Sequence, residues 1–218
     1  MSEVRELEYV VLTLKDIDDV AQFLVNHFYP RNNVILGTRC SPETALSADL
    51  HHIHLYLTSG LSTGARDKVT KNLVAVMLSC NYEHYAEATQ NPENEVRILR
   101  AWHIIRKLID LVVDTRKDRI LFGARICVDP DYVHQGVSTK IAKLCLDLGT
   151  KQGFTLACAN AISPYTDKAC LLLGFENVKT VNINTLEDGI FDLSCMSYKI
   201  LKIFTKQLGP ETILSSKL

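Results

Sequence analysis

Residues 120–160 constrain the fold of this chain more than any other segment. A strand-like apolar run over residues 120–129 is followed by a turn, an amphipathic helix beginning near residue 137, and a second apolar run over residues 154–160. The same alternation of strand-like and helix-like segments extends through most of the sequence. It predicts an α/β (α+β) fold, a sandwich in which a central mixed β-sheet is flanked by helices.

The length and composition fit a single domain over residues 1–218. A chain of 218 residues of which 47% are hydrophobic can bury one core without the help of disulfides. The seven cysteines are odd in number and scattered, and none forms a Cys-x-x-Cys pair. This pattern favours reduced thiols in the core over a disulfide framework or a zinc site.

The charge balance excludes several classes of function. Because 24 Lys and Arg stand against 25 Asp and Glu, the sequence lacks the basic character of a nucleic-acid-binding domain. The acidic N-terminus does not resemble a signal peptide, and the apolar stretch over residues 98–113 carries too many charges to span a membrane. We therefore expect a cytoplasmic protein that binds neither nucleic acid nor membrane, with an oligomeric state that the sequence leaves open.

The remaining elements are predicted from apolar periodicity and from turn and capping residues. Before the central segment we expect strands over residues 8–14 and 72–80, and helices over residues 17–28, from Ser41-Pro42 to about Thr58, and from Glu93 through Val112. After it we expect a helix over residues 165–173 and strands over residues 175–183 and 190–201. Trp102 is expected in the core.

The turn after the strand-like run carries an anion-binding pattern. Gly136 stands among small residues at the start of a helix, where unpaired N–H groups and the helix dipole attract an anion. The turn is neither a P-loop nor a dinucleotide fingerprint. Taken alone, the pattern is weak evidence, and the ordinary interpretation of Lys140 is a solvated surface residue.

In their order and spacing, these segments resemble the acetyl-CoA core of the GNAT acetyltransferase superfamily over residues 120–184. The matching features are Val128-x-Pro130-x-Tyr132, the Gly136 turn with its helix, and Leu173-Gly174-Phe175. The chain also resembles the arylalkylamine N-acetyltransferase-like branch of that superfamily. The features that carry this resemblance are Phe28-Tyr29-Pro30, a helix-rich insert and Gly174-Phe175-x-x-Val178. The resemblance implies an enzyme that uses acetyl-CoA to acetylate a small primary amine, such as an arylalkylamine, by direct transfer in a ternary complex.

The resemblance also implies which residues hold the cofactor. The family's Gln/Arg-x-x-Gly-x-Gly/Ala loop falls on residues 133–138, where only Gly136 matches outright. Val133 lacks the expected polar side chain and Ser138 replaces the final small residue, but backbone amides do most of the binding in such loops. The pyrophosphate is expected at Gln135, Gly136, Val137, Ser138, Thr139 and Lys140, and the pantetheine arm at Ile126, Cys127 and Val128.

Acid–base groups are expected near the start of the predicted helix over residues 165–173. Many superfamily members carry a Tyr where this chain has Cys170, and the arylalkylamine branch places a hydroxyl at Thr166, with Ser163 and Tyr165 nearby. These four are the catalytic candidates implied by the resemblance. The ordinary interpretations are a buried inert thiol for Cys170 and surface turn residues for the others.

The base is missing from its expected place. The branch associates a Glu soon after the first helix with that role, but this chain has Asn32 and Asn33 there. Asp129 or a histidine of the segment His51-His52-x-His54 are alternatives, and two imidazoles on one helical face do not complete a metal site, so we expect no metal. Two rival functions remain: acetylation of a protein lysine or N-terminus, and CoA binding by a catalytically degenerate regulatory protein.

Overall fold

A seven-stranded mixed sheet forms the centre of the molecule, for which a computed structural model describes residues 5–90, 96–186 and 189–209. Its strand order is β1-β2-β3-β4-β5-β7-β6. The strands are β1 (Leu7–Val11), β2 (Thr63–Asp67), β3 (Leu73–Asn81), β4 (Ile120–Val128), β5 (Leu156–Ala161), β6 (Glu176–Asn182) and β7 (Ile200–Gln207). β4 and β5 are parallel and the other neighbouring strands are antiparallel, which confirms the predicted mixed sheet.

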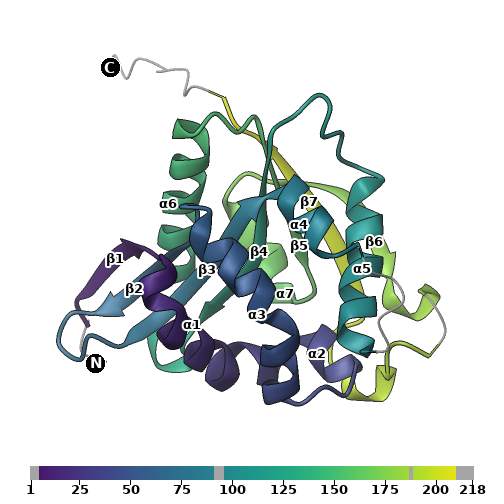
Figure 1. Cartoon of the computed structure of the whole chain (residues 1–218), viewed down its shortest axis with the longest axis horizontal. Coiled ribbons are helices and arrows are strands. Elements are labelled where there is room, and N and C mark those ends of the chain that lie inside the picture. The colour runs from purple at the N-terminus through teal and green to yellow at the C-terminus, as the bar shows by residue number, and fades with distance from the viewer. Residues whose placement is uncertain (1–4, 91–95, 187–188, 210–218) are drawn as a thin grey trace.

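Helices cover both faces of the sheet (Figure 1). One face carries α1 (Ile17–Phe23), α3 (Pro42–Thr58), α4 (Tyr82–Ala88) and α5 (Arg97–Asp110), and the other carries α6 (Val137–Lys151) and α7 (Pro164–Leu172). The short α2 (Asn33–Gly37) lies beside α5. None of the described helices is long and apolar enough to cross a membrane.

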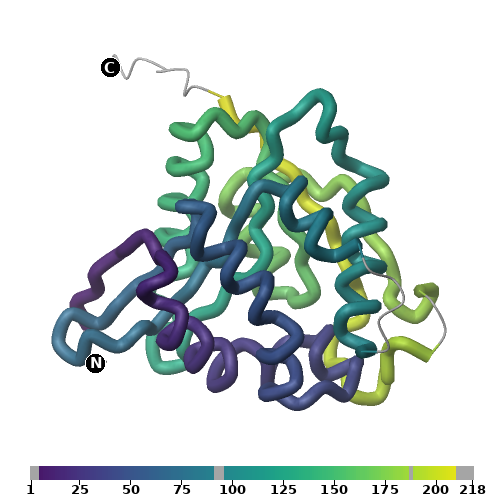
Figure 2. The backbone as a smooth tube through the Cα atoms, viewed as in Figure 1, coloured from purple at the N-terminus to yellow at the C-terminus, as the bar shows by residue number. Residues whose placement is uncertain are grey.

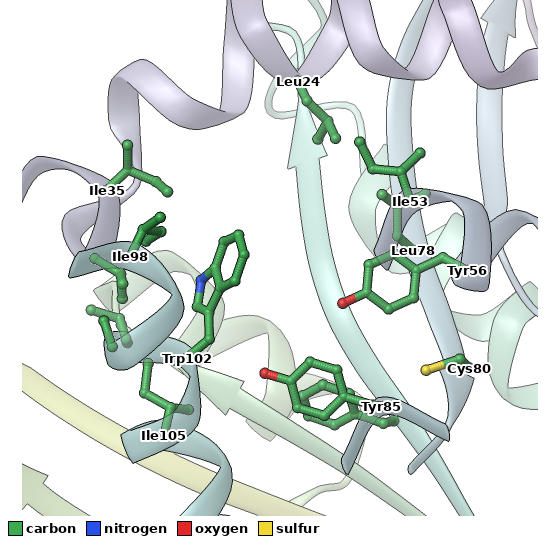
Figure 3. Packing of buried hydrophobic residues seen from close by; sticks show 14 of the residues in the cluster. Leu24, Ile35, Ile53, Tyr56, Leu78, Cys80, Tyr85, Ile98, Trp102 and Ile105 are labelled. Atoms are coloured by element: carbon green, nitrogen blue, oxygen red, sulfur yellow. The ribbon is translucent and has the colours of Figure 1, made fainter. Parts of the chain in front are cut away.

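The larger core lies between the sheet and the helices of the α1 face. Ile98, Trp102, Ile105 and Ile109 recur at helical spacing along α5 and are all buried, which confirms the predicted amphipathic helix and the core position of Trp102. Figure 3 shows Trp102 of α5 pointing into the interior, on the side of Ile53 and Tyr56 of α3. Each such side chain contributes about 1.5–3 kcal/mol when it is fully buried.

Close packing of α6 sets its position on the opposite face. A Cβ at Gly149 would lie 2.6 Å from Leu121 Cδ2, so a larger residue there would require the buried Leu121 side chain to shift. Ile141 and Cys145 of the same helix are fully buried. The contact of α6 with β4 fixes the helix N-terminus relative to the end of that strand.

The predicted strand over residues 190–201 is wrong for most of its length. Residues 193–195 form the 3-10 helix η6 (Leu193–Cys195), and the last strand is β7, which lies between β5 and β6 (Figure 2). Ile190 and Met196 are buried, and the Met196 Sδ would lie only 2.7 Å from a Cβ at Gly37 of α2. The apolar alternation of this segment therefore reflects packing against α2.

Three short elements, β2, α2 and α4, were not predicted. The other predicted strands and helices agree with the structure to within a few residues, including the Ser41 cap of α3 and the strand β4. The helix expected from Glu93 begins at Arg97, and residues 93–95 lie outside the described residues.

Candidate active site

Strands β4 and β5 run side by side for only part of their length. Their parallel pairing ends where Gly123 pairs with Ala159. Beyond that point β4 continues to Val128 and, among the described residues, pairs only with β3. β4 therefore has an open edge over residues 124–128, where an extended ligand can add hydrogen bonds.

The alternation of backbone groups decides which residues face this open edge. The N–H of Asp129 donates to the Val74 carbonyl of β3 at 2.9 Å. Since successive residues of a strand direct their backbone groups to opposite sides, Val128 and Ile126 face the opening. In agreement, the Val128 carbonyl accepts a hydrogen bond from Arg31 Nη2 at 3.2 Å. Two of the residues predicted to pair with the pantetheine arm are thus suitably oriented.

Cys127, the third of these residues, directs its side chain toward the α1 face of the sheet. Its Sγ lies 3.3 Å from Arg31 Nη2 and donates to the His27 carbonyl at 3.4 Å. Burial raises the pKa of this thiol to about 11, against an opposing effect of Arg31. Cys127 is therefore a neutral thiol at pH 7 and packs beside the opening rather than acting as a nucleophile.

The N-terminus of α6 follows closely after the open edge. The 3-10 helix η4 (Pro130–Tyr132) leads toward Gly136, the N-cap of α6, whose φ of 70° is left-handed. A Cβ at Gly136 would meet no described atom within 4 Å, so its backbone is open to a ligand. Because glycine has no side chain to cap the helix, the first N–H groups of α6 are available to an anion.

The first turn of α6 determines which of the predicted pyrophosphate-binding residues have a free backbone N–H group. The N–H groups of Val137, Ser138 and Thr139 belong to the first turn, where an α-helix supplies no acceptor. The Lys140 N–H instead donates to the Gly136 carbonyl at 3.1 Å, and Lys140 Nζ lies 5.5 Å from the centre of the Tyr9 ring. The backbone N–H of Lys140 is thus occupied within the helix, so any contact of Lys140 with an anion would use its exposed side chain.

Two hydrogen bonds from β2 hold this turn in place. The Tyr132 hydroxyl donates to Asp67 Oδ2 at 2.8 Å, and Thr63 Oγ1 donates to the Ile141 carbonyl of α6 at 2.8 Å. Sequence analysis missed this support because β2 itself was missed. The strand reads Thr-Gly-Ala-Arg-Asp and has few of the β-branched and aromatic residues that mark a strand.

The loop after α1 uses both of its asparagines structurally. Asn32 Oδ1 accepts the N–H of Val34 at 2.9 Å and so caps α2. Asn33 is buried, donates to the Ile162 carbonyl at 2.9 Å and accepts the N–H of Ser197 at 3.1 Å. Neither amide can take up a proton at neutral pH. This loop therefore contains no general base at the position that the resemblance assigns to one.

Of the four predicted catalytic residues, the structure brings two together and separates the other two from them. Ser163 caps α7 directly after β5: its Oγ accepts the Thr166 N–H at 3.1 Å and lies 2.8 Å from Thr166 Oγ1. Tyr165 is 84% exposed. Cys170 is buried in the smaller core between the sheet and the helices α6 and α7, and burial raises its pKa to about 12. Only Ser163 and Thr166 are brought together, as a pair of hydroxyl groups.

A buried charged pair under the open segment of β4 was missed by sequence analysis. Arg125 Nη2 lies 3.1 Å from Asp49 Oδ1 of α3, and the Tyr29 hydroxyl donates to Asp49 Oδ2 at 3.0 Å. Asp49 is 0% exposed and Arg125 is 8% exposed. Burial would by itself raise the pKa of Asp49, but the charges and hydrogen bonds of Arg125 and His52 together outweigh it and hold that pKa below its usual value. Asp49 is therefore ionised inside the protein.

Aromatic rings enclose this pair. The Arg125 guanidinium lies 4.9 Å from the centre of the Trp102 ring and 5.9 Å from that of Tyr56. In Figure 3 the hydroxyls of Tyr56 and Tyr85 and the ring of Trp102 point toward a common space. A guanidinium over aromatic faces gains cation–π attraction when it is removed from water.

The histidines of α3 divide between the interior and the surface. His52 is buried, with its Nδ1 3.4 Å from Asp49 Oδ1. His51 and His54 line a shallow surface pocket of about 390 Å³ together with His84 of α4. Among the described residues, no group of three or more His, Cys, Asp or Glu side chains is placed to hold a metal ion.

Comparison with known proteins identifies solved structures that have the same fold. No protein-family model and no curated protein sequence matches this chain. A mosquito arylalkylamine N-acetyltransferase-like 5b shares its fold at a TM-score of 0.78 and 16% identity, over 93% of this chain and 100% of that one. A Drosophila melanogaster polyamine N-acetyltransferase gives 0.72 and 17%, over 93% and 100%. The Salmonella typhimurium protein yncA, solved with its cofactor acetyl-CoA, gives 0.56 and 10%, over 97% and 99%.

The chain therefore has the fold of the GNAT N-acetyltransferases. The neighbours named as arylalkylamine and polyamine N-acetyltransferases, at 16–17% identity, are consistent with the resemblance noted in the sequence.

Proposed function

We propose that this protein is an acetyl-CoA-dependent N-acetyltransferase that acts on a small primary amine by direct transfer in a ternary complex. The observation that carries this proposal is the open edge of β4 leading to the α6 N-terminus at Gly136. An extended arm containing amides can pair along a strand edge, and a pyrophosphate fits the N-terminus of a helix. Two neighbours of this fold are named as N-acetyltransferases, and a third holds acetyl-CoA.

The residues around the opening define the steps that the protein itself would perform. Acetyl-CoA, when bound, supplies the thioester whose acetyl group passes to the amine. Backbone groups of Ile126 and Val128 would orient the cofactor arm, and an N–H at this edge would donate to negative charge developing on the carbonyl oxygen. Ser163 and Thr166 would pass a proton, which leaves the attacking amine and ends on the CoA sulfur, so that an acetamide and free CoA are the products.

Arylalkylamines are the acceptors that we propose within the class of small amines. The ring of Phe28 lies 5.9 Å from the guanidinium of Arg125 in the open segment of β4, and mosquito arylalkylamine N-acetyltransferases share the fold. An assay of free CoA release against a panel of arylalkylamines, polyamines and a lysine peptide separates this acceptor class from polyamine or protein acetylation.

Acetyl-CoA is expected to stabilise the protein against heat. A ligand at 100 times its dissociation constant stabilises the folded state by ~2.7 kcal/mol, which corresponds to a rise in Tm of roughly 5–10 °C for a chain of this size. Thermal unfolding with increasing acetyl-CoA measures the shift, and desulfo-CoA and adenosine serve as controls for the thiol and for the pyrophosphate. A Tm that does not move at millimolar acetyl-CoA would contradict the proposal.

A CoA-binding protein without turnover is the second candidate function. It is favoured by Asn32 and Asn33, whose amides hold backbone groups in place where the branch has a carboxylate. This alternative expects the same thermal shift with acetyl-CoA but no release of CoA with any amine of the panel. Release above the background rate of hydrolysis would exclude it.

A further inference from the structure

The separation of β4 from β5 coincides with an irregularity in β4. The pairing with β3 shifts register between Leu78 and Ser79, which are opposite Arg125 and Gly123. Ala124 lies between these two positions and, among the described residues, has no register partner in β3 or in β5. A bulge of this kind bends a strand and interrupts its ladder, so the open edge begins at Ala124.

The Arg125 side chain returns to this bulge. Arg125 Nη1 donates to the Ala124 carbonyl at 3.0 Å, while its Nη2 and Nε are directed to the two carboxylate oxygens of Asp49 at 3.1 and 3.4 Å. One planar guanidinium thus bridges the bulge and α3. Because the donors of a guanidinium have a fixed geometry, they set the distance and the angle between the Ala124 carbonyl and the Asp49 carboxylate.

Asp49 also connects this bridge to the loop on the α1 side of the opening. Its Oδ2 accepts the Tyr29 hydroxyl, and Arg31, two residues further along, donates to the Val128 carbonyl at the far end of the open edge. Both ends of that edge are therefore tied, directly or through a short loop, to the same buried carboxylate.

The cluster is not arranged for maximal stability. Replacing a buried ion pair by apolar side chains of similar size is often neutral or stabilising. A gain in folding free energy therefore does not explain why Asp49 and Arg125 are buried together. In addition, the His52 Nε2 and the Tyr56 hydroxyl are buried without a hydrogen-bond partner among the described residues. A core selected only for stability would avoid these costs.

We propose that Arg125 and Asp49 are positioning residues that fix where β4 leaves β5 and thereby keep residues 124–128 available to the cofactor arm. The inference rests on the proposed function, since it assigns the pair a part in acetyl-CoA binding. Without the bridge, the bulge carbonyl at Ala124 loses its partner, and the edge gains freedom to shift toward β5. Acetyl-CoA would then have to order the edge on binding, which weakens affinity.

The test is the double variant Asp49→Leu with Arg125→Met, which removes both charges and keeps a similar volume. We expect a Tm within a few degrees of the wild type, but an acetyl-CoA Kd raised by about tenfold or more, measured by calorimetry. Arg125→Lys is a second test that retains the ion pair but cannot reach Asp49 and Ala124 together. We expect it to fold and to bind acetyl-CoA with an intermediate Kd.

A matched control is Tyr82→Phe, which removes a buried hydroxyl that donates to Asp110 of α5 at 2.6 Å and to the Arg106 carbonyl, and not to any residue of the open edge. Its acetyl-CoA Kd should equal that of the wild type. Unchanged affinity in a folded double variant or in Arg125→Lys, within about twofold, would overturn the positioning role while leaving the proposed function intact. Failure of the wild-type protein to bind acetyl-CoA would instead overturn the proposed function.

Discussion

Gly136→Glu is expected to abolish acetyl-CoA binding. The new side chain would enter the open space above the first turn of α6 and place a carboxylate where we propose that the pyrophosphate binds. Juxtaposed like charges cost several kcal/mol, so the Kd should rise by about 100-fold or more. Calorimetric titration of acetyl-CoA into the purified variant measures this loss.

Gly136→Gln separates the effect of charge from that of conformation. Both variants place a side chain of nearly the same size at a φ of 70°, a left-handed conformation that costs a residue with a Cβ about 1–2 kcal/mol. Their Tm values should therefore fall by similar amounts, while Gly136→Gln should retain much more of the affinity. If Gly136→Glu bound acetyl-CoA as tightly as the wild type, the anion site would have to lie elsewhere.

Asp49→Leu alone is expected to cause the largest loss of stability of the substitutions considered. It leaves the Arg125 guanidinium buried without its counter-ion and leaves the Tyr29 hydroxyl without an acceptor. Breaking one side of a buried pair costs about 3–5 kcal/mol, or a fall in Tm of roughly 6–20 °C for a chain of this length. Urea unfolding of the single and double variants measures it, because adding Arg125→Met should recover most of the loss.

The same carboxylate should be visible in the pH dependence of stability. The folded-state pKa of Asp49 is lowered, so its contribution is fully present above the unfolded pKa of about 4 and is lost as the pH falls through the folded value. Asp49→Asn has no such titration. The difference in unfolding free energy between wild type and Asp49→Asn should therefore narrow as the pH falls from about 5 to about 2; a constant difference would contradict an ionised Asp49.

Local sequence signals predicted the elements that carry the proposed cofactor site. The apolar run of β4, the glycine at the start of α6 and the periodic apolar face of that helix each lie within a short stretch of chain, so their patterns were sufficient. The short elements β2, α2 and α4 were missed because five to seven residues give too few periods to recognise. The error over residues 190–201 has a different cause: the apolar residues of this segment alternate as in a strand, but Phe191 and Met196 pack against Gly37 of the helix α2.

The bridge between α3 and the bulge could not be predicted from a sequence pattern. Asp49 and Arg125 are 76 positions apart, and each stands alone in an otherwise ordinary helix or strand. A buried charge usually marks a position where the fold supplies a partner, but the partner is known only after the helix has been placed on the sheet. The same limit applies to Asn33, whose amide joins segments that are distant in the sequence.

The position of β7 has a consequence for the order in which the molecule can assemble during synthesis. β6 precedes β7 in the chain but joins the sheet only through it, because β7 pairs with β5 on one side and with β6 on the other. Until residues 200–207 leave the ribosome, β6 has no pairing partner in this sheet, and the edge of β5 is exposed. An unpaired strand edge in a nascent chain is prone to association with other chains. The sheet is completed only when β7 pairs with β5, a contact between segments that are distant in the sequence and that therefore form slowly.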